Sequence, residues 1–210
     1  MENFVYLVLF IPPLLLALTI HEYSHGYVAY RLGDPTAKLE GRLTLNPLKH
    51  IDIFGFLSFL IFRIGWAKPV PINPYNFSNI KKGIILTSLA GPLSNFILAI
   101  PFGLILRFIP KDVSILNPII IMAYGGLVYN LVLCAFNLIP IPPLDGSKIL
   151  FPLLPSSTIK MQMWLERYGF VVLIALIFFD RLTGVPVLWG WIGPFVSIFG
   201  QLFGGHLPLI

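Results

Sequence analysis

The long apolar stretches of this chain constrain its fold most, because a helix that crosses a lipid bilayer needs about 20 mostly apolar residues. Three stretches reach that length: Phe4 to Tyr30, Ile84 to Ile109, and Pro118 to Ile139. Two shorter ones, Tyr168 to Phe179 and Val185 to Phe203, are weaker candidates. With 57% hydrophobic and 11% charged residues, the chain is far less charged than a soluble domain, where about 25% is usual. The sequence therefore predicts an all-α membrane protein with about four to five transmembrane helices.

The chain reads as one membrane domain over residues 1–210, with a core at 4–155 and C-terminal membrane segments at 164–205. It shows no internal repeat of fixed period and no low-complexity linker. The first apolar stretch lacks the basic start and the small-residue cleavage site of a signal peptide, so we expect it to be retained.

The basic residues are distributed unevenly between the two sides of the membrane. If the N-terminus is outside and the first three spans alternate, eleven of the 14 Lys and Arg residues fall on one side. Only Arg107, Lys111 and Arg181 fall opposite. The positive-inside rule then makes the richer side cytoplasmic, which predicts a multi-pass protein of the cell membrane. Because these residues separate apolar spans and form no basic face with aromatics, nucleic acid is excluded as a partner and lipid is expected.

The segment between the first two long spans has two further patterns. Residues 37–45 alternate between apolar and polar side chains, which predicts a strand, and Val70 to Ile72 suggests a second, edge-type strand between prolines. A small membrane-associated β element is therefore expected here. Ile53 to Phe62 is apolar but too short to cross the bilayer, so we expect a re-entrant or interfacial piece.

Residues 21–25 read His-Glu-Tyr-Ser-His. On a helix, histidines at i and i+4 lie about 40° apart on one face, a spacing that allows both to bind one zinc ion. Glu22 lies beside them and within reach of a metal-bound water. Ionisable groups inside an apolar span indicate a functional site. His21 and His25 are therefore predicted metal ligands, and Glu22 the catalytic base.

A catalytic zinc site has three protein ligands and one open position. Asp145 is the predicted third ligand, because it follows the third span on the same side of the membrane as the two histidines. The prolines ahead of it end the helix, and non-helical backbone at membrane depth is tolerated only when it is buried in protein or lines a wet cavity. The other candidates near the spans are His50, Asp52, Glu166, Asp180 and His206.

Three motifs occur in a fixed order along the chain: HEYSH at 21–25, AGPLSN at 90–95 and NLIPIPPLDG at 137–146. Together they resemble the site-2 protease family of intramembrane metalloproteases, over about residues 10 to 155. The resemblance implies one Zn²⁺ per chain on His21, His25 and Asp145, with Glu22 as base. It also implies that Asn137 contacts a metal ligand or stabilises the transition state, and that Asn95 takes part in packing or substrate contact. Without a PDZ or CBS module, the chain is similar to the minimal members.

The expected function is hydrolysis of peptide bonds within or next to transmembrane segments of substrate proteins. The edge of the predicted strand at residues 37–45 is expected to hold an unwound substrate by main-chain pairing. Two alternatives use the same residues: a metal or proton transporter, and an inactive relative that binds without cutting. A transporter does not require Glu22, and transporters commonly show inverted repeats, which are not visible in this sequence. The intact Glu22 argues against an inactive relative.

Overall fold

The structure is a computed structural model that describes residues 2–62, 65–110 and 117–205 of the chain. These residues form helices joined by turns. The elements in chain order are α1 (Glu2–Arg31), α2 (Thr36–Leu39), η1 (Pro47–Lys49), α3 (Ile53–Phe62), η2 (Pro74–Asn76), α4 (Ile80–Phe108), α5 (Pro118–Asn137), α6 (Asp145–Leu150), η3 (Phe151–Leu153), η4 (Ser156–Thr158), α7 (Ile159–Thr183) and α8 (Val187–Gly204).

Within the described residues, four helical stretches are long and apolar enough to cross a bilayer: Ile80–Phe108, Pro118–Asn137, Ser156–Asp180 and Val187–Gly204. They correspond to the second and third predicted spans and to both weaker candidates. The predicted first span lies on α1, an unbroken helix of 30 residues. The chain is therefore a multi-pass membrane protein.

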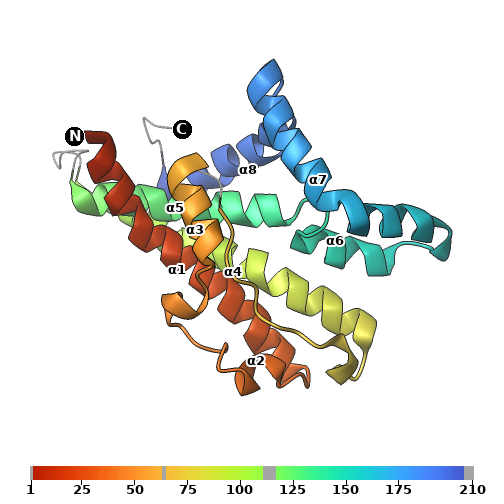
Figure 1. Cartoon of the computed structure of the whole chain (residues 1–210). Helices are drawn as coiled ribbons and strands as arrows, with labels where there is room; N and C mark the ends of the chain where they lie inside the picture. The colour runs from red at the N-terminus through yellow and green to blue at the C-terminus, as the bar shows by residue number, and fades with distance from the viewer. Residues whose placement is uncertain (1, 63–64, 111–116, 206–210) are drawn as a thin grey trace.

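Helices α1, α4 and α5 form the centre of the molecule, and each contacts the other two (Figure 1). α1 and α5 run in the same direction and α4 runs opposite to them. The C-terminal ends of α1 and α5 and the beginning of α4 therefore meet on one side. α8 packs along α4 and α5, whereas α7 leads away from the bundle.

Local signals explain where the central helices begin. The side chains of Asn79 and Asn117 accept hydrogen bonds from main-chain N–H groups in the first turns of α4 and α5, which satisfies donors that a helix start leaves free.

Small residues allow the helices to pack closely, and close packing holds helices together in lipid, where a hydrophobic driving force between them is missing. A Cβ added to Gly103 on α4 would lie 2.5 Å from Cβ of Phe203 on α8.

The predicted β element is wrong for the described residues, which contain only one isolated bridge, between Ile51 and Ala67. Residues 36–39 form one helical turn, and Gly41 reverses the chain with a φ of +64°. The apolar and polar residues are also not sorted as a strand would sort them, since Leu39 is 80% exposed and Arg42 is 8% exposed. The edge at residues 37–45 is therefore not available for strand pairing with a substrate.

The expected second strand, Val70 to Ile72, is also absent. Pro71 removes one of its main-chain donors, and the N–H of Val70 bonds to the side chain of Glu22 and not to another strand. The prediction for Ile53 to Phe62 fits better, because α3 covers these residues and is too short to span a bilayer.

Candidate metal centre and catalytic cavity

The two histidines of α1 and the first residue of α6 meet in one buried cluster. Nε2 of His21 and Nε2 of His25 lie 3.1 Å apart. Oδ2 of Asp145 lies 3.2 Å from the first nitrogen and 3.1 Å from the second. All three residues are buried. The structure thus brings together the three predicted ligands, and they form the one group of this kind found among the described residues.

This donor set fits a zinc ion. Bonds of about 2.0–2.2 Å in a tetrahedral site separate the ligand atoms by roughly 3.3 Å, close to the spacing found here. Oδ2 of Asp145 is buried and accepts no well-formed hydrogen bond from the described residues. An unpaired buried carboxylate oxygen is unfavourable, and a cation between the three atoms would remove that cost.

Hydrogen bonds on the far side of each imidazole orient the rings. Nδ1 of His25 lies 2.7 Å from the main-chain oxygen of Thr87. Because that oxygen only accepts, Nδ1 carries the proton and Nε2 keeps its lone pair. Nδ1 of His21 lies 2.6 Å from Oδ1 of Asn95. Such partners fix the tautomer and the orientation of metal-binding histidines.

The amide of Asn95 is itself fixed in direction. Its Nδ2 donates to the main-chain oxygen of Ala17 and to Oδ1 of Asn130 on α5, whose own Nδ2 donates to Gly126. The oxygen of Asn95 therefore faces His21. Asn95 therefore contacts a predicted metal ligand, where the sequence suggested packing or substrate contact.

One face of α4 carries the groups that contact the histidines. Thr87, Gly91 and Asn95 follow one another at intervals of four residues, as His21 and His25 do on α1. A Cβ at Gly91 would lie 2.4 Å from Nε2 of His25, so a glycine is required there. Sequence reasoning missed Thr87 and Asn130, although the spacing of four would have indicated Thr87.

The backbone ahead of Asp145 brings it to the histidines. α5 ends at Asn137, and residues 138–144 form turns before α6 begins at Asp145 itself. A Cβ at Gly146 would lie 2.3 Å from the main-chain oxygen of Leu138, so this turn folds tightly against the start of α6. The Asp-Gly pair thus combines a predicted ligand with the glycine that permits its position.

A cavity of about 380 Å³ adjoins the cluster, and its lining includes the three predicted ligands together with Glu22 and Asn137. Oε2 of Glu22 accepts a hydrogen bond of 2.8 Å from the N–H of Val70. Nδ2 of Asn137 donates to the main-chain oxygen of Leu133. Asn137 therefore lies at the cavity wall, and none of its hydrogen bonds reaches a histidine in the described part of the chain.

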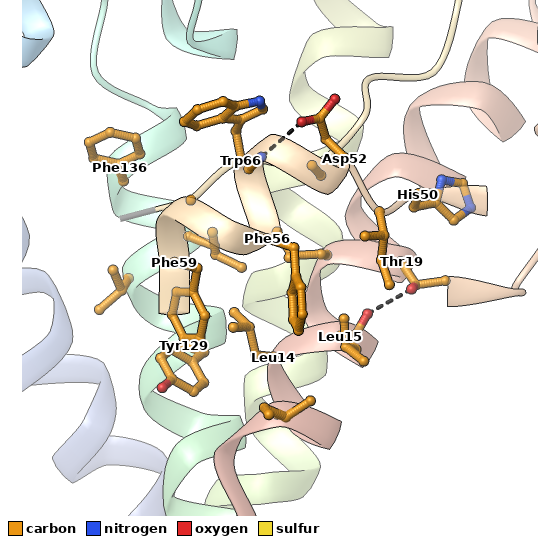
Figure 2. A pocket seen from close by; sticks show the side chains of 18 of the residues that line it. Leu14, Leu15, Thr19, His50, Asp52, Phe56, Phe59, Trp66, Tyr129 and Phe136 are labelled. Atoms are coloured by element: carbon orange, nitrogen blue, oxygen red, sulfur yellow. Dashed lines mark hydrogen bonds between the residues drawn. The ribbon is translucent and has the colours of Figure 1, made fainter. Parts of the chain in front are cut away.

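A larger cavity of about 600 Å³ lies elsewhere, between α1, α3 and α5 (Figure 2). Apolar side chains such as Leu14, Phe56 and Phe59 line most of it. Three of the other candidate ligands, His50, Asp52 and Asp180, line this cavity and not the metal cluster. Glu166 is an exposed residue of α7, and His206 lies outside the described residues. We place the chemistry in the smaller cavity because, among the described residues, a group of side chains able to bind a metal converges only there.

Comparisons with known proteins agree with this geometry. The chain is 40% identical over 202 residues to "Putative zinc metalloprotease YwhC" of Bacillus subtilis (strain 168), a match that covers 90% of each protein. Residues 109–178 match the family described as "Peptidase family M50". The chain belongs to peptidase family M50. The predicted resemblance to the site-2 proteases, which are the same family, is confirmed.

More distant members of the M50 family are also similar to this chain. "Putative zinc metalloprotease Rip2" of Mycolicibacterium smegmatis is 30% identical over 174 residues, which cover 78% of this chain and 64% of that protein. Zinc metalloprotease MJ0392 of Methanocaldococcus jannaschii is 27% identical over 158 residues, which cover 75% of this chain and 38% of that protein. No solved structure matches the chain.

Proposed function

We propose that this M50 peptidase is a zinc-dependent endopeptidase that cuts transmembrane segments of other membrane proteins. The observation that carries the proposal is the buried triangle of two imidazole nitrogens and one carboxylate oxygen beside Glu22. The cluster joins the C-terminal half of α1 to the start of α6, and relatives of the chain are named as zinc metalloproteases.

The residues divide the chemistry between them. His21, His25 and Asp145 would hold the ion, and three ligands leave one position for the reactants. Zinc at this place supplies a Lewis acid that polarises water and the scissile carbonyl. Glu22 takes the proton of the attacking water and returns it to the leaving amine. Asn137 at the cavity wall offers an amide to the substrate.

The position of the cavity supports a membrane-spanning substrate and an active site on the cytoplasmic side. The cavity lies between the C-terminal half of α1, the N-terminal part of α4 and the turns after α5, on the side where the sequence places most basic residues. By the positive-inside rule that side is cytoplasmic. A helical substrate must unwind here before its peptide bond reaches Glu22, because helical carbonyls are occupied by hydrogen bonds.

Two substitutions test the proposal by separating metal binding from proton transfer. Glu22→Gln keeps the size of the side chain but cannot accept a proton, so zinc per chain should stay near one while cleavage is lost. Asp145→Ala removes a ligand and should lower both zinc content and cleavage. The measurements are elemental analysis and cleavage of a single-span peptide in vesicles, with and without chelator. Cleavage by Glu22→Gln at the wild-type rate, or by wild type after complete removal of metal, would overturn the proposal.

A further inference from the structure

The segment from Lys68 to Asn76 forms the wall of the catalytic cavity that faces Glu22. We infer that this segment is a positioning device for Glu22, which acts through the N–H of Val70 and is held in place by Arg42 and Asp34. The inference rests on the proposed function for the role of Glu22 as base. It assigns functions to three residues outside the metal cluster.

Val70 makes two contacts with α1. Its N–H donates to Oε2 of Glu22 at 2.8 Å, and its side chain is buried against Gly26. A Cβ at Gly26 would lie 3.1 Å from Cγ1 of Val70, so the segment approaches the helix closely one turn after Glu22. A hydrogen bond from an N–H to a carboxylate is charge-assisted and directional. It therefore holds Oε2, and leaves Oε1 for the proton, since Oε1 accepts no hydrogen bond from the described residues.

The prolines on either side make Val70 unusual. Pro69 and Pro71 carry no N–H, so Val70 provides the only main-chain donor between Lys68 and Ile72. A shift of the segment by one residue in either direction would place a proline, which has no N–H, opposite Glu22. The position of this one N–H then depends on what holds the segment at either side.

Two buried charged side chains bind the segment on either side of Val70. Nη2 of Arg42 donates to the main-chain oxygens of Lys68 at 2.9 Å and Pro69 at 3.3 Å. The carboxylate of Asp34 accepts from the N–H of Asn73 and from Nδ2 of Asn76, both at 2.7 Å. Burial of a charge is costly unless it is hydrogen-bonded. Here the guanidinium of Arg42 and the carboxylate of Asp34 both form hydrogen bonds with the segment that carries Val70.

Hydrogen exchange tests the contact without any need for activity. Val70 is the only residue between Lys68 and Ile72 with an exchanging main-chain amide. In a peptide that begins at Lys68 and ends at Pro71, Lys68 loses its deuterium to back-exchange. The deuterium that this peptide retains therefore measures exchange at Val70 alone. Glu22→Ala should accelerate exchange at Val70 by about tenfold or more, the range for a hydrogen bond to a charged group. Arg42→Gln should accelerate it as well. An unchanged exchange rate in Glu22→Ala would overturn the inference.

Kinetics test the consequence for catalysis. Val70→Pro removes the N–H, and Val70→Ala keeps the N–H but loses the side-chain contact with Gly26. We expect Val70→Pro to lower kcat about tenfold or more, with KM within about twofold of wild type and zinc per chain unchanged. Val70→Ala should keep a larger share of kcat. Equal kcat values for wild type and Val70→Pro at equal zinc content would contradict the inference.

Arg42 provides a second test if Val70→Pro fails to bind zinc. Arg42→Gln should lower kcat while zinc content is retained, and Arg42→Lys, which keeps a donor, should restore part of it. A combined Arg42→Gln and Val70→Pro protein should lose no more than Val70→Pro alone, because both act through one N–H. If the losses of kcat from the two substitutions multiply, Arg42 affects catalysis by a route other than the N–H of Val70, and its part in the inference is wrong. If the wild-type protein shows no zinc-dependent cleavage, the proposed function is wrong. The exchange rates of Val70 in wild type and in Glu22→Ala still show whether the segment contacts Glu22.

Discussion

Gly91 determines how closely α4 can approach the two histidines of α1. A Cβ at this position would lie 2.4 Å from Nε2 of His25 and 2.6 Å from Cε1 of His21. Gly91→Ala should therefore displace a ligand ring and lower zinc affinity by at least about tenfold, a loss typical of disturbed ligand orientation. The matched control is Gly193→Ala on α8, where a Cβ meets nothing within 4 Å. Zinc affinity measured by competition with a chelator should be normal in the control, and equal values for the two variants would refute the contact.

Asn95 and Asn137 should differ in what their loss changes. Asn95 accepts from His21, so Asn95→Leu should lower zinc affinity roughly 10- to 100-fold. Asn137 lines the cavity without a hydrogen bond to a ligand. We therefore expect Asn137→Leu to keep zinc and to lose cleavage. Metal titration and peptide cleavage on both variants check this, and loss of zinc from Asn137→Leu alone would reverse the assignment.

At the scale of elements, Asp34 joins the turn after α1 to the segment before α4. Burial alone would raise the pKa of Asp34, but hydrogen bonds from Thr36, Asn76 and Asn73 outweigh it and bring the pKa below its ordinary value of 3.8. The charged form thus stabilises the fold. This contribution is fully present well above pH 3.8 and is lost as the pH falls below that value through the lower pKa of the folded state.

Asp34→Asn should therefore lower the free energy of unfolding by about 1–3 kcal/mol at pH 7, and the difference from wild type should shrink below about pH 4. Thermal unfolding in detergent at a series of pH values measures this. Glu166→Gln, which removes an exposed carboxylate, is the control for the loss of one negative charge. A difference that grows as the pH falls would have the wrong sign for a carboxylate stabilised in its charged form.

At the scale of the whole molecule, the parallel course of α1 and α5 makes a prediction about orientation. Residues 49 and 160 should face the cytoplasm and residue 111, which lies outside the described residues, should face outward. Single cysteines at these positions in a Cys134→Ser background can be labelled with a membrane-impermeant thiol reagent. Labelling of residue 111 from the cytoplasm, or of residue 49 from outside, would reverse the proposed orientation.

The sequence by itself determined the features that depend on local order along the chain. The helical spans follow from apolar length, and the joint position of His21 and His25 follows from the helical repeat. The topology of three alternating spans was then enough to place Asp145 on their side. These inferences need only the geometry of single helices and the thickness of a bilayer.

The tertiary structure alone decided which groups face each other across helices. The bonds from His21 to Asn95 and from His25 to Thr87 require that one particular face of α4 lies against α1. The alternation at residues 37–45 predicted a strand, and this prediction was wrong. A period of two in the sequence does not reveal that Arg42 is buried and bonds to the main chain at Lys68. Side-chain contacts between distant segments depend on how the helices pack, and packing in lipid is set by shape and hydrogen bonds, which no local pattern encodes.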